Sequence, residues 1–275
     1  MGQRRGIRVR STTRWSPRRW SRPLADATGR SRRSGESTST SLAVKSSVFL
    51  VPTEQGSPPR CALTTLTTIT SGRASVAGVD VAADPDGARR KIGVALQEAG
   101  LDPRQTGREL LTLQARLFGT SASEASDRAA HLLTLVDLVD PADRRIKGYS
   151  GGMNRRLDLA SALVHEPEVL FLDEPTTGLD PASRLTVWEE LRRINHLGTT
   201  IFLTTQYLEE ADQLCDRIAI IDNGVIVREG TPAQLKSELQ GRRPLSTTPT
   251  LDEVFLDATG RSRERLAGEV QEVRA

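Results

Sequence analysis

The sequence predicts an α/β fold built around a parallel sheet. Apolar runs of strand length alternate with segments of helical periodicity, as in strands joined by helical crossovers. Residues 169–175, VLFLDEP, stay apolar until the run ends in two carboxylates, as expected of a strand buried on both faces. Residues 217–230 form two β runs around Asn223-Gly224, a strong hairpin signal.

The other elements follow in chain order. Thr106 with Glu109 three residues later forms a capping box that should start a helix. Pro181 stands at a favoured first helical position. Strands are expected at 74–81 (with Gly78 as a turn or bulge), 92–97 and 199–205, and helices at 85–91, 106–118, 124–139, from the GYSGGM turn to 163, from 181, and at 207–214.

The charge distribution divides the chain. Residues 1–60 carry thirteen basic and three acidic side chains, a net charge of +10, whereas the remainder has 25 basic and 32 acidic residues. The first segment is rich in Arg, Ser, Thr and Pro and has no sustained period, so we expect disorder through about residue 47. The expected organisation is a disordered segment at 1–61, a folded α/β domain at 62–240 with a helical subdomain at about 100–148, and an extension at 241–275.

Composition also excludes several classes of protein. Cys61 and Cys215 are too few for a disulfide framework or a thiolate metal site, which favours a reducing compartment. No apolar run approaches the ~20 residues that cross a bilayer. The basic start is followed by no apolar signal segment; a transit peptide or a nucleic-acid-binding arm would share its composition.

Asp173 and Glu174 end the apolar strand. Ligands of open α/β sheets bind at the carboxyl ends of strands. Adjacent side chains of a strand point in opposite directions, so one carboxylate can hold Mg²⁺ while the other orients an attacking water. The alternative is a strand that simply runs into a proline-containing turn.

Ser150, Gly151 and Gly152 precede a helix. Glycines permit close backbone approach, and the free N–H groups of a helix N-terminus suit an anion. The alternative is an ordinary N-capped helix. Gln97 ends a strand and could contact Mg²⁺ or water, although most glutamines face solvent.

The order and spacing of these motifs resemble the ABC-type ATPase family over residues 62–260. VALQ resembles its Q-loop, YSGGM its signature motif, VLFLDEP its Walker B strand and LD at 179–180 its D-loop. Longer segments such as LDEPTTGLDP, TTQYLEEADQLCDRIAIIDNG and TLDEVFLDATG resemble the daunorubicin-resistance type of drug-exporter ATPase. The implied fold is a P-loop NTPase-like ABC core with a helical subdomain, from which the N-terminal strands and phosphate loop are expected to be absent.

The resemblance implies roles at matching positions. Asp173 would support Mg²⁺, and Glu174 would act as general base or orient the water. Gln97 would contact the metal, sense the γ-phosphate of ATP and face a membrane subunit. The chemistry implied is phosphoryl transfer, which depends on positioning and charge neutralisation.

Other positions belong to an implied ATPase dimer. Ser150, Gly151 and Gly152 would contact ATP bound to the opposite subunit, and Asp180 would lie at the dimer seam. Gln206 stands where most members have histidine; it can donate a hydrogen bond to a phosphate oxygen but cannot change charge near neutral pH.

The resemblance therefore implies an ATP-hydrolysing subunit of an antibiotic or multidrug exporter. Its partners would be an integral-membrane permease and a second ATPase subunit, with no nucleic acid. It would be cytoplasmic and peripheral on the inner face of the membrane. Two alternatives remain: a degenerate, non-catalytic ABC-like protein, and a soluble ABC protein acting on nucleic acid, although such proteins usually carry two cassettes.

The Walker A loop, G-x-x-x-x-G-K-[ST], has no match in the sequence. Residues 50–57 stand in its place and read LVPTEQGS, without lysine. When the third base of each codon is joined to the first two of the next, codon degeneracy from Leu50-Val51 onward allows G-P-N-G-A-G-K-S. Working back from Leu50, the same frame allows G-E-V-F-G-F-L. We interpret residues from about 35 to Cys61 as a frame-shifted reading, with the family frame resuming near Ala62; the alternative is a genuinely divergent N-terminus.

The frame-shift hypothesis makes a prediction about one codon. The hidden lysine exists only if Ser57 is encoded by AGT or AGC. Resequencing of the gene across codons 30–65 should find one of these two codons, or an insertion or deletion error whose removal restores GPNGAGKS. A TCN codon for Ser57 would refute the hypothesis.

Overall fold

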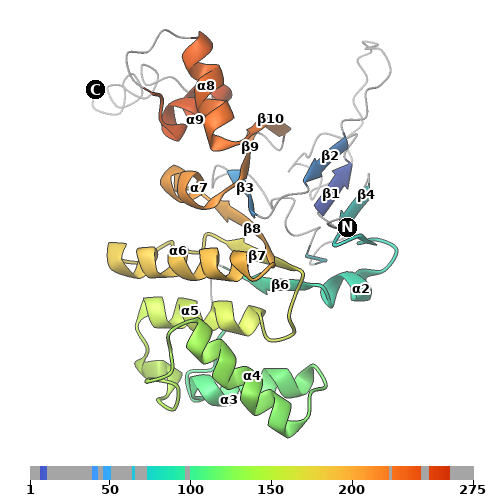
Figure 1. Ribbon diagram of the computed structural model, residues 1–275, viewed down its shortest axis with the longest axis vertical. Helices are drawn as coiled ribbons and strands as arrows, with labels where there is room; N and C mark the ends of the chain where they lie inside the picture. Colours follow the sequence, from blue (N-terminus) through green and yellow to red (C-terminus); the bar gives the residue numbers. More distant parts are fainter. Residues whose placement is uncertain are drawn as a thin grey trace, which may run out of the picture.

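The computed structural model describes residues 7–10, 39–42, 46–50, 64–65, 73–96, 100–222, 225–242 and 248–260. A central six-stranded sheet and a four-stranded antiparallel sheet lie side by side (Figure 1). The central sheet has the order β10 (Val225–Gly230), β9 (Arg217–Asp222), β3 (Ser46–Leu50), β8 (Thr200–Thr205), β7 (Val169–Asp173) and β6 (Ile92–Ala95), parallel except for β10. The second sheet has the order β2 (Ser39–Leu42), β1 (Ile7–Arg10), β4 (Arg73–Val76) and β5 (Val79–Asp80).

The helices form layers around the central sheet. The helix bounds are α2 Pro85–Arg89, α3 Gly107–Leu117, α4 Ala122–Leu135, α5 Gly151–Ala162, α6 Pro181–His196, α7 Leu208–Leu214, α8 Pro232–Arg242 and α9 Leu251–Thr259, with a 3₁₀ turn at Ile146–Gly148. Helices α3 and α4 pack together beyond α5, away from the sheet, whereas α8 and α9 lie at the opposite end near β9 and β10 (Figure 1). In the part of the chain that is described, no helix has both the length and the apolar character of a membrane span.

Strand β7 is the centre of the core, as its unbroken apolar run predicted. All five of its residues are buried. Leu170 and Leu172 pack with the helices α3 to α6, whereas Val169 and Phe171 pack toward β4 and α2. Polar groups are therefore excluded from both faces of the strand and collect at its end.

The capping box predicted at Thr106 is present. The Thr106 hydroxyl accepts a hydrogen bond from the backbone N–H of Glu109, and the Glu109 carboxylate accepts one from the N–H of Thr106. The helix predicted at 124–139 ends earlier, at Leu135, because Asp137 has a left-handed backbone with φ +52°.

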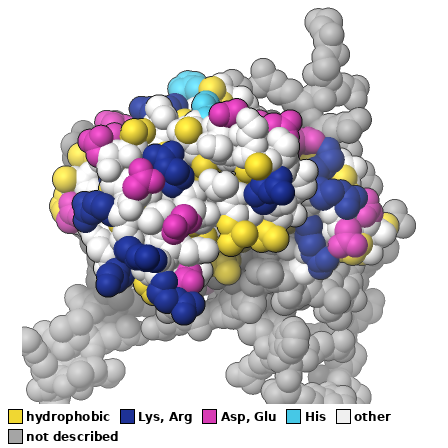
Figure 2. All heavy atoms as spheres, turned by 90° about the horizontal axis from the view of Figure 1, so that it is seen from below, with side chains coloured by type: hydrophobic (Ala, Val, Ile, Leu, Met, Phe, Trp, Pro, Cys, Tyr) yellow, Lys and Arg dark blue, Asp and Glu magenta, His cyan; other side chains and the backbone are white. Residues whose placement is uncertain are grey.

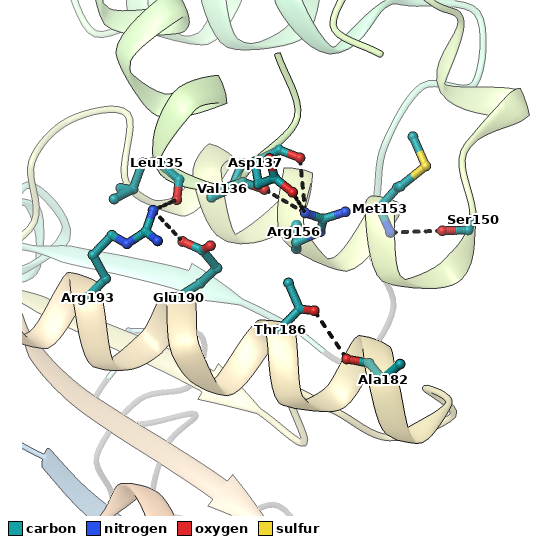
Figure 3. A network of polar contacts seen from close by, with 10 residues as sticks. All are labelled: Leu135, Val136, Asp137, Ser150, Met153, Arg156, Ala182, Thr186, Glu190 and Arg193. Atoms are coloured by element: carbon teal, nitrogen blue, oxygen red, sulfur yellow. Dashed lines mark hydrogen bonds and ion pairs between the residues drawn. The ribbon is translucent and has the colours of Figure 1, made fainter. Parts of the chain in front are cut away.

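The early end of α4 is held from two neighbouring helices. Arg156 of α5 donates to the carbonyl oxygens of Val136 and Asp137, and Arg193 of α6 donates to that of Leu135 (Figure 3). These bonds satisfy carbonyl groups that no intrahelical N–H can reach, and cations suit the negative end of the helix dipole.

Two N-terminal features differ from the expectation. β1, β2 and β3 all lie within residues 1–61, where we expected disorder and no N-terminal strands. β3 pairs in parallel with β8 and β9, so its backbone shares hydrogen bonds with two strands whatever its side chains are. The strand predicted at 74–81 is divided into two paired strands, because Ala77 and Gly78 both adopt positive φ; the turn predicted at Gly78 is confirmed.

Gly93 in β6 permits close packing against the end of α5. A Cβ atom there would lie 2.1 Å from the carbonyl oxygen of Ala162 and 3.0 Å from Cγ of Pro167. We expect Gly93→Ala to lower the free energy of unfolding by about 1–3 kcal/mol, measured by urea denaturation. Gly100→Ala is the matched control, because no atom lies within 4 Å of its Cβ position; equal losses in both variants would contradict the prediction.

Candidate functional site

Asp173 and Glu174 lie at the carboxyl end of β7 and have different partners. Asp173 is only 7% exposed, and its Oδ1 accepts a 2.6 Å hydrogen bond from the Thr204 hydroxyl of β8. The backbone N–H of Glu174 donates to the Thr204 carbonyl at 2.8 Å. Thr204 therefore fixes both residues to the neighbouring strand.

Glu174 occupies a strained turn. Its φ is +45°, a conformation that costs a non-glycine residue about 1–3 kcal/mol and is concentrated at functional sites. Its Oε2 accepts hydrogen bonds from the Thr177 hydroxyl at 3.1 Å and from Nε2 of Gln206 at 3.3 Å. The structure thus brings Glu174 and Gln206 together, two predicted site residues 32 positions apart.

Gly151 and Gly152, the first two residues of α5, have different surroundings. Ser150 is the N-cap of α5, and its hydroxyl accepts from the N–H of Met153 (Figure 3). Gly151 is exposed, and a Cβ there would meet only Leu179 Cδ2, at 3.8 Å. At Gly152 a Cβ would lie 2.7 Å from the Ser183 hydroxyl of α6. Gly151 therefore offers an open backbone to a ligand, whereas Gly152 permits α5 to approach α6.

Asp180 is the N-cap of α6. Its carboxylate accepts from the backbone N–H of Ser183 at 3.0 Å and from the Ser183 hydroxyl at 2.6 Å. These bonds hold the pKa of Asp180 below its ordinary value. Because Ser183 also meets Gly152, the loops that begin α5 and α6 are joined through one serine.

Gln97 lies outside the described residues, so its predicted role stays a prediction. The residue before it, Leu96, is described, and its carbonyl accepts a hydrogen bond from Arg155 of α5. Arg155 also donates to the carbonyls of Asp173 and Pro175. The end of β6 is therefore connected to the turn that contains Glu174.

Sequence reasoning missed the polar side chains beneath this turn. Burial raises the pKa of Asp158 to about 6 and lowers that of its partner Arg155, so desolvation outweighs their mutual attraction in both groups. Glu210 of α7 is fully buried, and its burial raises its pKa. The only sign in the sequence of these buried polar groups was the spacing of Arg155 and Asp158, which share one face of a helix among apolar neighbours.

The residues of this edge fit a magnesium ion in part. Mg²⁺ usually takes one or two carboxylates together with phosphate oxygens and waters, so the lone Asp173 carboxylate at a strand end suits it. Among the described residues, no group of three or more His, Cys, Asp or Glu side chains could hold a metal. Binding of the metal would therefore depend on the phosphates of a nucleotide. The glycine-rich loop and lysine that bind such phosphates have no counterpart in the sequence.

Comparisons with known proteins show which family the chain resembles. Residues 61–177 match the family model described as ABC transporter. In this region the chain is similar to ABC transporter ATP-binding proteins, and the fold is that of their ATPase core. The match begins where the sequence predicted the family frame to resume, near Ala62.

Several relatives are resistance ATP-binding proteins. The chain is 52% identical over 177 residues to the daunorubicin/doxorubicin resistance ATP-binding protein DrrA of Streptomyces peucetius, covering 64% of this chain and 54% of that protein. It is 40% identical over 189 residues to the linearmycin resistance ATP-binding protein LnrL of Bacillus subtilis, covering 68% and 61%. The chain thus spans about half the length of the curated relatives it matches.

Solved structures share the fold. An ATP-binding subunit of an ABC transporter superposes with a TM-score of 0.66 at 24% identity, covering 81% of this chain and 92% of that one. The ATP-binding cassette MJ0796, solved as a dimer in a post-hydrolysis state bound to ADP and Pi, has a TM-score of 0.59 at 25% identity, covering 68% and 84%.

The buried Asp158 leads to a prediction on pH and stability. Its folded pKa of about 6 lies above the ordinary 3.8, so the folded state binds the proton more tightly. The stabilisation is present below about pH 4 and is lost as the pH rises through 6. Between pH 4.5 and 7, urea denaturation should show the unchanged chain losing about 2 kcal/mol relative to Asp158→Asn.

The control for this prediction is Asp143→Asn. The hydrogen bond from Arg108 lowers the pKa of the exposed Asp143 carboxyl below its ordinary 3.8, so this group stays ionised between pH 4.5 and 7 and its removal should leave the pH dependence in that range unchanged. A parallel pH dependence for Asp158→Asn and the unchanged chain would show that Asp158 is not the group responsible.

Proposed function

We propose that the chain is the ATP-binding and ATP-hydrolysing subunit of a drug or antibiotic exporter. The observation that carries this proposal is the turn after β7, where Glu174 has a strained backbone and accepts from Thr177 and Gln206. The exporter type rests on the similarity to resistance ATP-binding proteins.

The turn supports a division of roles. When bound, Mg²⁺ would neutralise charge on the phosphates of ATP. Asp173, anchored by Thr204, would hold the metal, directly or through water. Glu174 would accept the proton of the attacking water at Oε1, because within the described part of the chain only Oε2 accepts hydrogen bonds. Gln206, already beside Glu174, would donate to a phosphate oxygen.

The proposed complex contains two ATPase subunits and a membrane permease. Ser150, Gly151 and Gly152 would face ATP on the opposite subunit, with Asp180 at the seam; the open backbone at Gly151 supports this. In the region of α3 and α4, Figure 2 shows hydrophobic side chains among charges of both signs. Exposed hydrophobic side chains there include Leu113, Leu117, Phe118 and Val139, a surface suited to a permease. The subunit would be cytoplasmic and peripheral on the membrane.

The position of β3 supports the frame-shift interpretation of the N-terminus. A P-loop follows a strand and opens onto the carboxyl edge of the sheet. β3 ends at Leu50, paired with Thr205 of β8, at the edge where Asp173 lies. In the shifted reading frame, the five residues before the loop are VFGFL. They fall on the five positions of β3, and GPNGAGKS would follow directly.

The alternative function is a degenerate ABC-like protein that dimerises without hydrolysing ATP. The missing Walker A loop favours it for the printed chain, because the phosphates lose their main cradle. The intact Glu174 and its partners argue against a chain adapted to lose catalysis. Restoring the loop distinguishes the two functions.

We expect the printed chain to hydrolyse Mg-ATP negligibly in a phosphate-release assay. A chain carrying GPNGAGKS in place of residues 51–58 should hydrolyse ATP, because its glycine loop and lysine cradle the phosphates. In that chain, Glu174→Gln should lower kcat by at least about 100-fold.

Glu209→Gln is the matched control. It removes the same charge from an exposed residue of α7. Its kcat should stay within about twofold of the loop-restored chain. Equal turnover by the printed and loop-restored chains would contradict the frame-shift interpretation, and an active Glu174→Gln variant would remove Glu174 from its proposed role.

A further inference from the structure

Arg155 lies on the inner side of α5 and reaches the edge of the central sheet. Its side chain is 11% exposed. Its guanidinium donates to the carbonyl oxygens of Leu96, Asp173 and Pro175, at 3.0 Å for Asp173 and 2.8 Å for Pro175. One side chain therefore connects α5 to the ends of two adjacent strands, β6 and β7.

The arrangement requires the shape of arginine as well as its charge. A guanidinium presents five N–H donors in a fixed planar fork, whereas an ammonium is a compact point charge. Asp158 lies 3.2 Å from Nη1 of Arg155 and is itself 13% exposed. A buried ion pair of this kind adds little to the free energy of unfolding. We therefore attribute to it a structural role, which is to fix the position of the Arg155 guanidinium against the carbonyl groups of the sheet edge.

The same turn is held from its other side by Glu210. Oε1 of Glu210 accepts from the Thr176 hydroxyl at 2.9 Å and from Nε1 of Trp188 at 3.0 Å. Pro175 and Thr176 are consecutive, so Arg155 and Glu210 bind adjacent residues. Glu174, with its left-handed backbone, lies between Asp173 and Pro175, the two residues of the turn whose carbonyl groups accept from Arg155.

We propose that Arg155 is a positioning residue that couples the first turn of α5 to Glu174. The inference rests on the proposed function and adds a connection between sites to it. In the proposed dimer, Ser150 and Gly151 face nucleotide on the partner subunit. A displacement of α5 on nucleotide binding is transmitted through Arg155 to the turn that carries Glu174.

The test compares Arg155→Gln with Arg156→Gln in the full-length chain. Arg156 is the adjacent residue of α5, and its side chain is 16% exposed. It donates to Val136 and Asp137 at the end of α4 and not to the sheet edge (Figure 3). Both variants lose a mostly buried guanidinium, so a general loss of stability affects both.

The first measurement is amide hydrogen exchange of residues 173–179. The N–H groups of Glu174, Thr177 and Leu179 are bonded within this turn or to β8. Arg155→Gln should accelerate their exchange about tenfold, whereas Arg156→Gln should change it less than twofold and accelerate exchange at 136–138 instead. Equal effects of both variants at 173–179, or none from Arg155→Gln, would overturn the proposal.

The second measurement separates shape from charge. Trp188 reports on the turn through Glu210, and Trp15→Phe with Trp20→Phe leaves it as the single tryptophan. Arg155→Gln should shift its emission and increase quenching by acrylamide, whereas Arg156→Gln should not. Arg155→Lys should fail to restore the signal, because one ammonium cannot span three carbonyls; full restoration by lysine would overturn the positioning role.

Turnover distinguishes this inference from the proposed function. In the loop-restored chain, Arg155→Gln should lower kcat about tenfold with KM within twofold, since Arg155 is not proposed to touch the nucleotide. A change in KM with unchanged kcat would overturn the inference. If the loop-restored chain has no turnover, the proposed function fails, while exchange and fluorescence still decide the role of Arg155.

Discussion

The burial of β7 on both faces is the constraint on which the rest of the structure depends. Leu170 and Leu172 pack toward the helices, and Val169 and Phe171 pack toward the second sheet, so both faces of the strand must be apolar up to its end. The first carboxylates therefore appear at the carboxyl end of the strand, at the edge of the sheet. Any chemistry that they perform is confined to this edge.

The edge is organised by hydrogen bonds from elements far apart in the chain. Thr204 comes from β8, Gln206 precedes α7, and Arg155 comes from α5. Together they hold Glu174 in a backbone conformation that a non-glycine residue rarely adopts. Strain of this kind persists only where the surroundings over-determine it.

The N-terminal region contributes the described strand β3 to the central sheet, although its sequence does not resemble the family. β3 occupies the position between β8 and β9 from which a phosphate loop would follow, although the printed residues after it lack the lysine and glycines of such a loop. The family match begins at residue 61, just beyond this point. The shifted reading frame that we propose would account for the composition of the segment and for the place where the resemblance begins.

The sequence by itself determined the α/β class, the positions of most strands and helices, and the predicted site residues. These features are local, since apolar periodicity, caps and motif spacing lie within short stretches of the chain. Gln97 is the exception in the site, because it falls outside the described residues.

Only the tertiary structure decided which of these residues lie together. It separated Gly151, which is open, from Gly152, which packs on Ser183, although the two are adjacent and identical in sequence. It also assigned Arg155 to the sheet edge and Arg156 to the end of α4. The physical reason is that a hydrogen bond depends on where the acceptor lies in space, and the acceptors of Arg155 come from strands far away in sequence.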